Sequence, residues 1–221
     1  MSEVVITVRG EHEVRAAPEE GVVRISVRAE GHERGPVVER IASLADPIRS
    51  DLAARKEQGT LREWSSQRVA VWANRPWNSE GKQLSVVHYA SVEFIATFTD
   101  FAAMSWWVAD LAERDGIQID EVTWQLTRAT AQRAEADVAA AAVRAAVDRA
   151  TAYAAAIGLS TVTPLEIADV GLLTRNDSPG APASAMMRAA FAADTGGGAG
   201  IELQPEDIVV TAAVEARFTA S

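Results

Sequence analysis

The chain has 221 residues, 48% of them hydrophobic, a formal net charge of −10 at pH 7 and no cysteine. This length fits one large domain or two small ones, with enough apolar residues to fill a core. The acidic balance argues against nucleic acid as a partner, because nucleic acid attracts basic surfaces, and the lack of cysteine excludes disulfides and thiolate metal sites.

Two alternating runs between residues 3 and 31 predict two strands. The segment APEEG between them (17–21) has a proline that suits the start of a turn and a glycine, Gly21, that suits a left-handed position. We therefore expect the two strands to form a hairpin in which Ala17 lies opposite Val22. In this register the acids of the first strand point to the wetter face, toward Arg24 and Arg28 of the second.

Acids and an imidazole are dense within GEHEVRAAPEEG (10–21). A metal site or an acid/base centre around His12 needs its ligands on one side of the backbone, whereas alternation places His12 on the apolar face and directs Glu11 and Glu13 away from it. The sequence favours the alternative, an edge or core histidine beside a solvated acidic face. The other members of this candidate cluster are Glu19, Glu20 and His32.

The remaining elements follow from periodicity. Apolar residues at helical spacing predict a core-facing helix from Pro36 to about Leu52, with a kink or break near Ser43–Asp46 because Pro47 removes one backbone hydrogen bond. Further along, we expect strands at 62–73 and 83–99, a helix at 100–114, a strand at 118–128, an alanine-rich helix at 130–157, and strands at 162–174 and 206–219.

The alanine-rich helix is expected to end at Gly158. A stripe of small residues along it predicts close packing against a sheet or a second helix. The stripe comprises Ala136, Ala140, Val143, Val147, Ala150, Ala154 and Ile157.

Residues 176–203 are rich in Gly, Ala, Pro and Ser and are too long for an ordinary connection. They predict a flexible loop between the last two strands, which is either mobile or binds something. Met187 and Phe191 are four residues apart and could dock as a short amphipathic turn at an oligomer contact. A disordered linker is the alternative.

The order β-β-α-β-β-α-β-α-β-β resembles that of the bacterial SIMPL-domain family. The alternating opening VVITVRGEHEVRAAPEEGVVRISVRAEG and the strand that passes into a helix, HYASVEFIATFTDFAAMSWWVADL, are both similar to the family's pattern. The alanine-rich AEADVAAAAVRAAVDRATAYAAAIGL and the closing strand PEDIVVTAAVEARF resemble it as well.

The resemblance implies an α+β fold with an antiparallel or mixed sheet and packed helices, in a single domain of residues 1–221 that can divide into two subdomains. It implies relatives found mainly in the periplasm or envelope, some forming ring-like or channel-like oligomers and some linked to stress tolerance. It supplies no catalytic residue.

Four other patterns bear on function. His88 lies on the apolar face of its strand, so a hydrogen-bonded core histidine is favoured over a catalytic one. Ser79 and Lys82 match an S-x-x-K pattern but fall in an exposed connection, and GGGAG (196–200) lacks the context of a phosphate-binding loop. No cofactor or metal site is predicted. Trp77, at a polar hairpin tip, is either idle or an anchor for a partner.

The sequence thus predicts a non-enzymatic, self-associating SIMPL-domain protein. The alternative is a small-molecule or metal-dependent enzyme, or a ligand-binding module, that uses His12 or His88. No apolar run approaches the roughly 20 residues of a transmembrane helix, and the N-terminus lacks the pattern of a secretory signal. A cytoplasmic location without a transmembrane segment is therefore expected.

Overall fold

The computed structural model describes residues 3–173 and 203–221. Within them it has the expected element order and the α+β class. The elements are β1 (Val4–Ala16), β2 (Glu20–Gly31), α1 (Arg34–Glu57), β3 (Leu61–Asn74), β4 (Val87–Phe98), α2 (Phe101–Ala112), β5 (Ile117–Gln125), α3 (Arg128–Ala156), β6 (Val162–Asp169) and β7 (Ile208–Ala220). Met187, Phe191 and nearly all of the predicted 176–203 loop lie outside the described residues.

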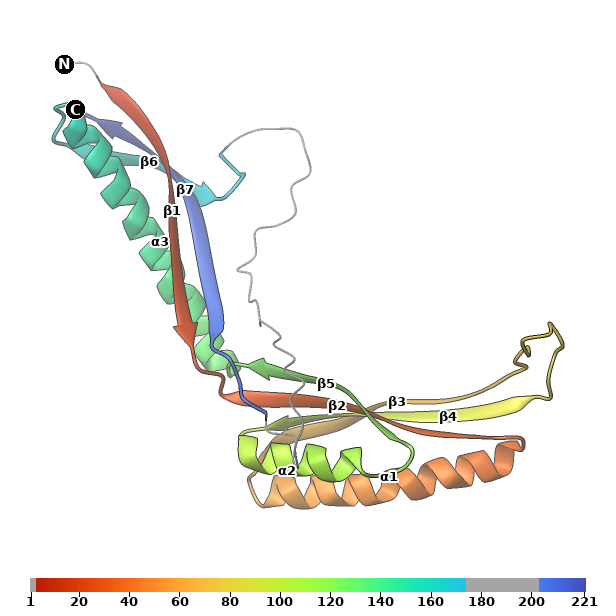
Figure 1. Cartoon of the computed structure of the whole chain (residues 1–221). Helices are drawn as coiled ribbons and strands as arrows, with labels where there is room; N and C mark the ends of the chain where they lie inside the picture. The colour runs from red at the N-terminus through yellow and green to blue at the C-terminus, as the bar shows by residue number, and fades with distance from the viewer. Residues whose placement is uncertain (1–2, 174–202) are drawn as a thin grey trace. The chain divides into compact units, whose positions relative to one another are not determined.

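The chain divides into two compact units, which are described separately. The three-stranded unit contains, of the described residues, 3–17, 126–173 and 206–221. Its sheet has the order β1-β7-β6, and both pairings are antiparallel. The long helix α3 lies along β1 and β7 (Figure 1). Its left-handed terminator is Gly158, as the sequence predicts.

Small residues bring α3 close to the three-stranded sheet. The buried positions of α3 recur every four residues and are Val138, Ala142, Ala146, Ala150 and Ala154. The four alanines pack on the apolar face of β1 and β7 that includes Val8, Ala216 and Phe218, and Val138 packs with Ile208 and Val210 at the start of β7. Small residues of this helix therefore pack on a sheet, as predicted. Some predicted members of the stripe do not take part, because they are exposed: Ala136, Ala140, Val147 and Ile157.

The four-stranded unit contains, of the described residues, 18–125 and 203–205. Its antiparallel sheet has the order β3-β4-β2-β5, and α1 and α2 lie on the same face (Figure 1). Alternate residues of β2 and β4, such as Ile25 and Phe94, enter the core between sheet and helices. The two helices are joined by Trp107, whose Nε1 donates to Asp51 Oδ2 at 2.8 Å.

Helix α1 runs unbroken from Arg34 to Glu57 with Pro47 inside it. Of the kink or break predicted near Ser43–Asp46, the break does not occur. Ala45, Ile48 and Leu52 are buried around the proline, so packing against the sheet maintains the helix at a position where its local hydrogen bonding is weakened.

The predicted hairpin of the first two strands is also wrong. β1 pairs with β7, whereas β2 lies between β4 and β5, so the two strands belong to different units. Gly21 is not among the left-handed glycines. It lies in β2, where an added Cβ would come within 2.5 Å of Met104 Sδ. Alternation identified both strands correctly, but it carries no information about which partner each strand takes.

Among the described residues, no helix is long and apolar enough to cross a membrane.

Candidate functional site

The connection between β3 and β4 is an ordered tip rather than a loose loop. The side-chain Oδ1 of Asn78 accepts hydrogen bonds from the backbone N–H groups of Glu80, at 3.1 Å, and Lys82, at 2.8 Å. Gly81 adopts φ +74°, which closes the turn without the strain that a side chain would bring. An isolated bridge between Trp77 and Gln83 extends the pairing toward the sheet.

This tip presents apolar side chains to solvent. Trp77 is 67% exposed and Leu84 is 45% exposed, although both side chains are mainly apolar. The structure thus places Trp77 at the tip and exposed, as the sequence predicts. The exposure of Leu84 was missed, because strong alternation over 83–99 indicated a strand that the structure begins only at Val87.

The tip is also basic within an acidic chain. Residues 75–86 contain two basic side chains, Arg75 and Lys82, against the single acid Glu80. Their formal charge is +1 in a chain of net −10, so the remaining residues carry −11. Of the side chains at this tip, tryptophan and arginine are both enriched where proteins bind partners.

His12 lies in β1 and is exposed, opposite Ala212 of β7. Glu11 forms an ion pair with Arg9 of its own strand at 3.4 Å, not with Arg24, which pairs with Glu121. The expected cross-strand pairing with β2 is therefore absent among the described residues. Glu11 and Glu13 are exposed, as a solvated acidic face requires, but His12 is exposed as well, so its predicted place on a buried apolar face is wrong.

His88 begins the second half of the β3–β4 hairpin and lies opposite Gly31 and Ala73. It is half-buried, and its Nδ1 finds no hydrogen-bond partner among the described residues. The expected hydrogen bond of a core histidine is thus missing at this nitrogen. His88 lies in the four-stranded unit and His12 in the three-stranded unit, so the fold assigns them to different units.

The other sequence motifs do not assemble a reactive centre in the described part of the chain. Ser79 and Lys82 both lie in the exposed turn of the tip, and no helix start supports an S-x-x-K arrangement there. Within residues 3–173 and 203–221, no group of three or more His, Cys, Asp or Glu is arranged to hold a metal ion. The glycine run 196–200 lies outside the described residues.

One acid of the segment 10–21 is buried, although the density of acids in that segment suggests a metal or acid/base site. Glu20, at the start of β2, is 1% exposed. Its carboxylate accepts hydrogen bonds from Arg62 of β3 and from Gln125 Nε2 of β5, the latter at 2.9 Å. The pKa of Arg62 is raised chiefly by its hydrogen bond to Glu63; burial opposes this effect, and the charges of Glu20 and Glu63 raise the pKa further. The carboxylate is thus a paired structural group.

A comparison with protein-family models gives a match over most of the chain. The family model SIMPL, described as "Protein of unknown function (DUF541)", matches residues 6–218 and so covers nearly the whole chain. A comparison with curated proteins finds no match.

Proposed function

The chain belongs to the SIMPL family, whose description names no activity, and from this premise we propose that it is a non-enzymatic protein that self-associates through the β3–β4 tip. The proposal commits to a second copy of the chain as the partner. The tip of one copy, with Trp77, Leu84, Arg75 and Lys82, docks on an acidic surface of the next copy.

The exposure of Trp77 on an ordered turn carries the proposal. A large aromatic side chain loses water-exposed apolar area when it is covered, and such anchors dominate the binding energy of interfaces. Because Asn78 and Gly81 fix the turn, the tip loses little conformational entropy on docking.

Charge supports a second copy as the partner. A tip of formal charge +1 on a chain whose remaining residues carry −11 is attracted to the body of another copy. The tip and the acidic surface are different patches, so the contact is heterologous. Repetition of such a contact gives a closed ring or an open chain of subunits.

The placement of the histidines supports a non-enzymatic role. His12 is exposed on a strand, and His88 is in the other unit with no hydrogen-bond partner at Nδ1 among the described residues. A general base or nucleophile needs a second group within hydrogen-bond reach to orient or activate it.

Light scattering coupled to size exclusion tests the proposal on the full chain. We expect a mass that is a multiple of 23.6 kDa at tens of micromolar, and Trp77→Ser is expected to weaken association by about tenfold, or 1.4 kcal/mol. The matched control is Trp106→Ser on α2, which removes a tryptophan that is 77% exposed but lies outside the tip. A monomeric wild type, or an equal effect of both substitutions, would contradict the proposal.

A further inference from the structure

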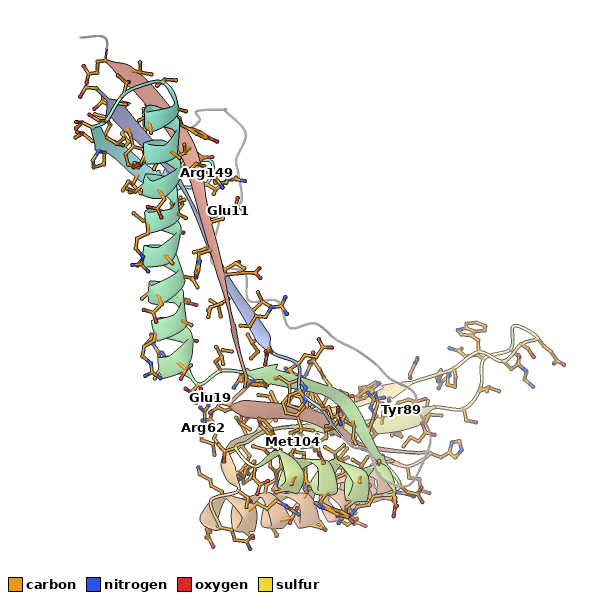
Figure 2. The ribbon with its side chains drawn as sticks, turned by 60° about the vertical axis from the view of Figure 1, so that its left-hand side comes forward. Glu11, Glu19, Arg62, Tyr89, Met104 and Arg149 are labelled. Carbon is orange, nitrogen blue, oxygen red and sulfur yellow. The ribbon has the colours of Figure 1, made fainter. Side chains whose placement is uncertain are left out.

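The face of the four-stranded sheet that α1 and α2 leave uncovered carries a groove of about 510 Å³. Tyr89 lies on this face and Met104 on the helix-covered face (Figure 2). The volume falls within the range of small-molecule sites, which is roughly 300–1,000 Å³. The lining residues are Ser26, Arg28, Ala29, Glu30, Trp72, Tyr89, Ala90, Ser91 and Glu93.

One wall of the groove is a flat aromatic surface. Trp72 of β3 lies opposite Tyr89 of β4, and their rings stack with centroids 5.5 Å apart and planes inclined by 16°. Stacking fixes both side chains, and Trp72 remains 47% exposed. A rigid, solvent-facing aromatic pair offers an apolar platform that a ligand can cover at little entropic cost.

The other side of the groove carries charges of both signs with no partner of their own. Within the described residues Arg28, Glu30 and Glu93 form no ion pair or hydrogen bond through their side chains. Their neighbours on the same face differ, because Arg24 pairs with Glu121 at 3.8 Å and Ser26 Oγ donates to Asp120 Oδ2 at 2.5 Å. Arg28, Glu30 and Glu93 can therefore each bind a charged group of a ligand without losing a partner within the described residues.

The register of β2 and β4 determines how far apart these charged side chains lie. Arg28 lies opposite Ser91, Glu30 lies opposite Tyr89, and Glu93 lies opposite Ser26. Glu30 follows Arg28 by two residues on the same face of β2, and Glu93 is diagonal to Arg28 across the pair, at a separation of about 7–8 Å for such positions. The guanidinium and a carboxylate are therefore neighbours that can each receive a different group of one small ligand.

We propose that this groove binds a small zwitterion of the α-amino-acid type with an apolar or aromatic side chain. The ligand carboxylate binds the Arg28 guanidinium, which suits a bidentate pair. The ligand ammonium binds Glu93, and the ligand side chain extends the other way along β4 to cover the Trp72–Tyr89 pair. This inference is independent of the self-association proposal, because Trp77 and the tip take no part in the groove.

Calorimetric titration of the full chain tests this with three matched probes. L-phenylalanine has both charges, L-phenylalaninamide lacks the carboxylate and 3-phenylpropionate lacks the ammonium. We expect saturable binding of one L-phenylalanine per chain and binding of each single-charge analogue at least about tenfold weaker. Absence of saturable phenylalanine binding overturns the proposal, and so does equal binding of the three probes, which would indicate a purely apolar surface.

Two substitutions test which charged group of the ligand each protein side chain binds. Arg28→Gln is expected to weaken phenylalanine binding about tenfold and to leave phenylalaninamide unaffected. Glu93→Gln should weaken phenylalanine and phenylalaninamide and leave 3-phenylpropionate unaffected. Arg24→Gln is the control, since Arg24 is on the same strand and face but already has a partner. If Arg24→Gln reduces binding as much as Arg28→Gln in proteins with unchanged circular dichroism, the assignment is wrong.

Discussion

Gly10 lies where the backbone of β1 meets that of α3 without room for a side chain. An added Cβ would collide with the carbonyl oxygen of Ala142 and would lie 2.6 Å from Ala146 N and 2.8 Å from Ala146 Cβ. Two of these obstacles are backbone atoms of a helix, so they cannot move aside as a flexible side chain could. Gly10 therefore sets how closely α3 can approach the sheet.

Gly10→Ala is expected to lower the free energy of unfolding by about 3 kcal/mol, as overpacking of a tight contact does. Gly35→Ala in α1 is the control, because nothing lies within 4 Å of its added Cβ, and its effect should stay within about 0.5 kcal/mol. Urea unfolding followed by circular dichroism measures both. Similar midpoints for the two variants would contradict the close approach of α3 to β1.

At the scale of elements, three strands of the four-stranded sheet are tied together at one end. Buried Glu20 of β2 receives Arg62 from β3 and Gln125 from β5, and β4 completes the sheet between β2 and β3. Figure 2 shows Arg62 near this end of the sheet. Removing Arg62 leaves a carboxylate in a nearly inaccessible position with only one amide to compensate it.

Arg62→Ala is expected to destabilise the protein by about 2 kcal/mol, because the buried Glu20 loses a charged hydrogen-bond donor. Arg114→Ala is a closely matched control. Arg114 is 43% exposed against 41% for Arg62 and also pairs with an acid, but its partner Asp110 is at the surface, and such pairs contribute about 0–1 kcal/mol. All six tryptophans lie in residues 64–124, so tryptophan fluorescence during urea unfolding reports on the unit that contains Arg62. Equal losses for the two variants would mean that Glu20 does not depend on Arg62.

The elements show what sequence patterns can predict and what they cannot. Period-two alternation and helical spacing locate every strand and helix of the described chain to within a few residues, because each element buries one face. They fail for β1 and β2, because a proline and a glycine between two strands suit a hairpin as well as a connection between units. They also fail at Pro47, where packing decides over local hydrogen bonding.

Among the candidate functional residues, some could also be predicted from the sequence and others could not. Trp77 could be predicted as exposed, because it lies in a polar turn with no apolar neighbours of regular period. Its role at an interface stays a prediction. The groove could not be predicted, because Arg28, Trp72 and Glu93 come from three strands whose order, β3-β4-β2, is unknown until the pairing is known. The burial of Glu20 depended on the same missing information.

For the whole molecule, charge asymmetry makes the proposed self-association sensitive to salt. At about 0.1 M salt charges interact over about 10 Å, and at 1 M over about 3 Å. Raising NaCl from about 50 mM to about 500 mM should therefore weaken association several-fold. Sedimentation velocity at both concentrations measures this.

The double variant Arg75→Gln, Lys82→Gln removes the basic side chains of the tip. Its association should depend less on salt, because the remaining contribution of Trp77 comes from apolar burial. Association that strengthens with salt would show a contact driven by apolar burial alone and would contradict the assignment of an acidic partner surface.

The pairing of β1 with β7 governs the order in which the protein can fold during synthesis. Residues 18–125 are one continuous stretch and can form most of their unit early, whereas β1 cannot complete its ladder until β7, which begins at Ile208, has been made. At a translation rate of about 5–20 residues per second, this interval lasts roughly 10–40 s. Throughout it β1 is a strand without a partner, and such strands tend to aggregate. We expect the charges at Arg9, Glu11, Glu13 and Arg15 to oppose aggregation of β1 during this interval.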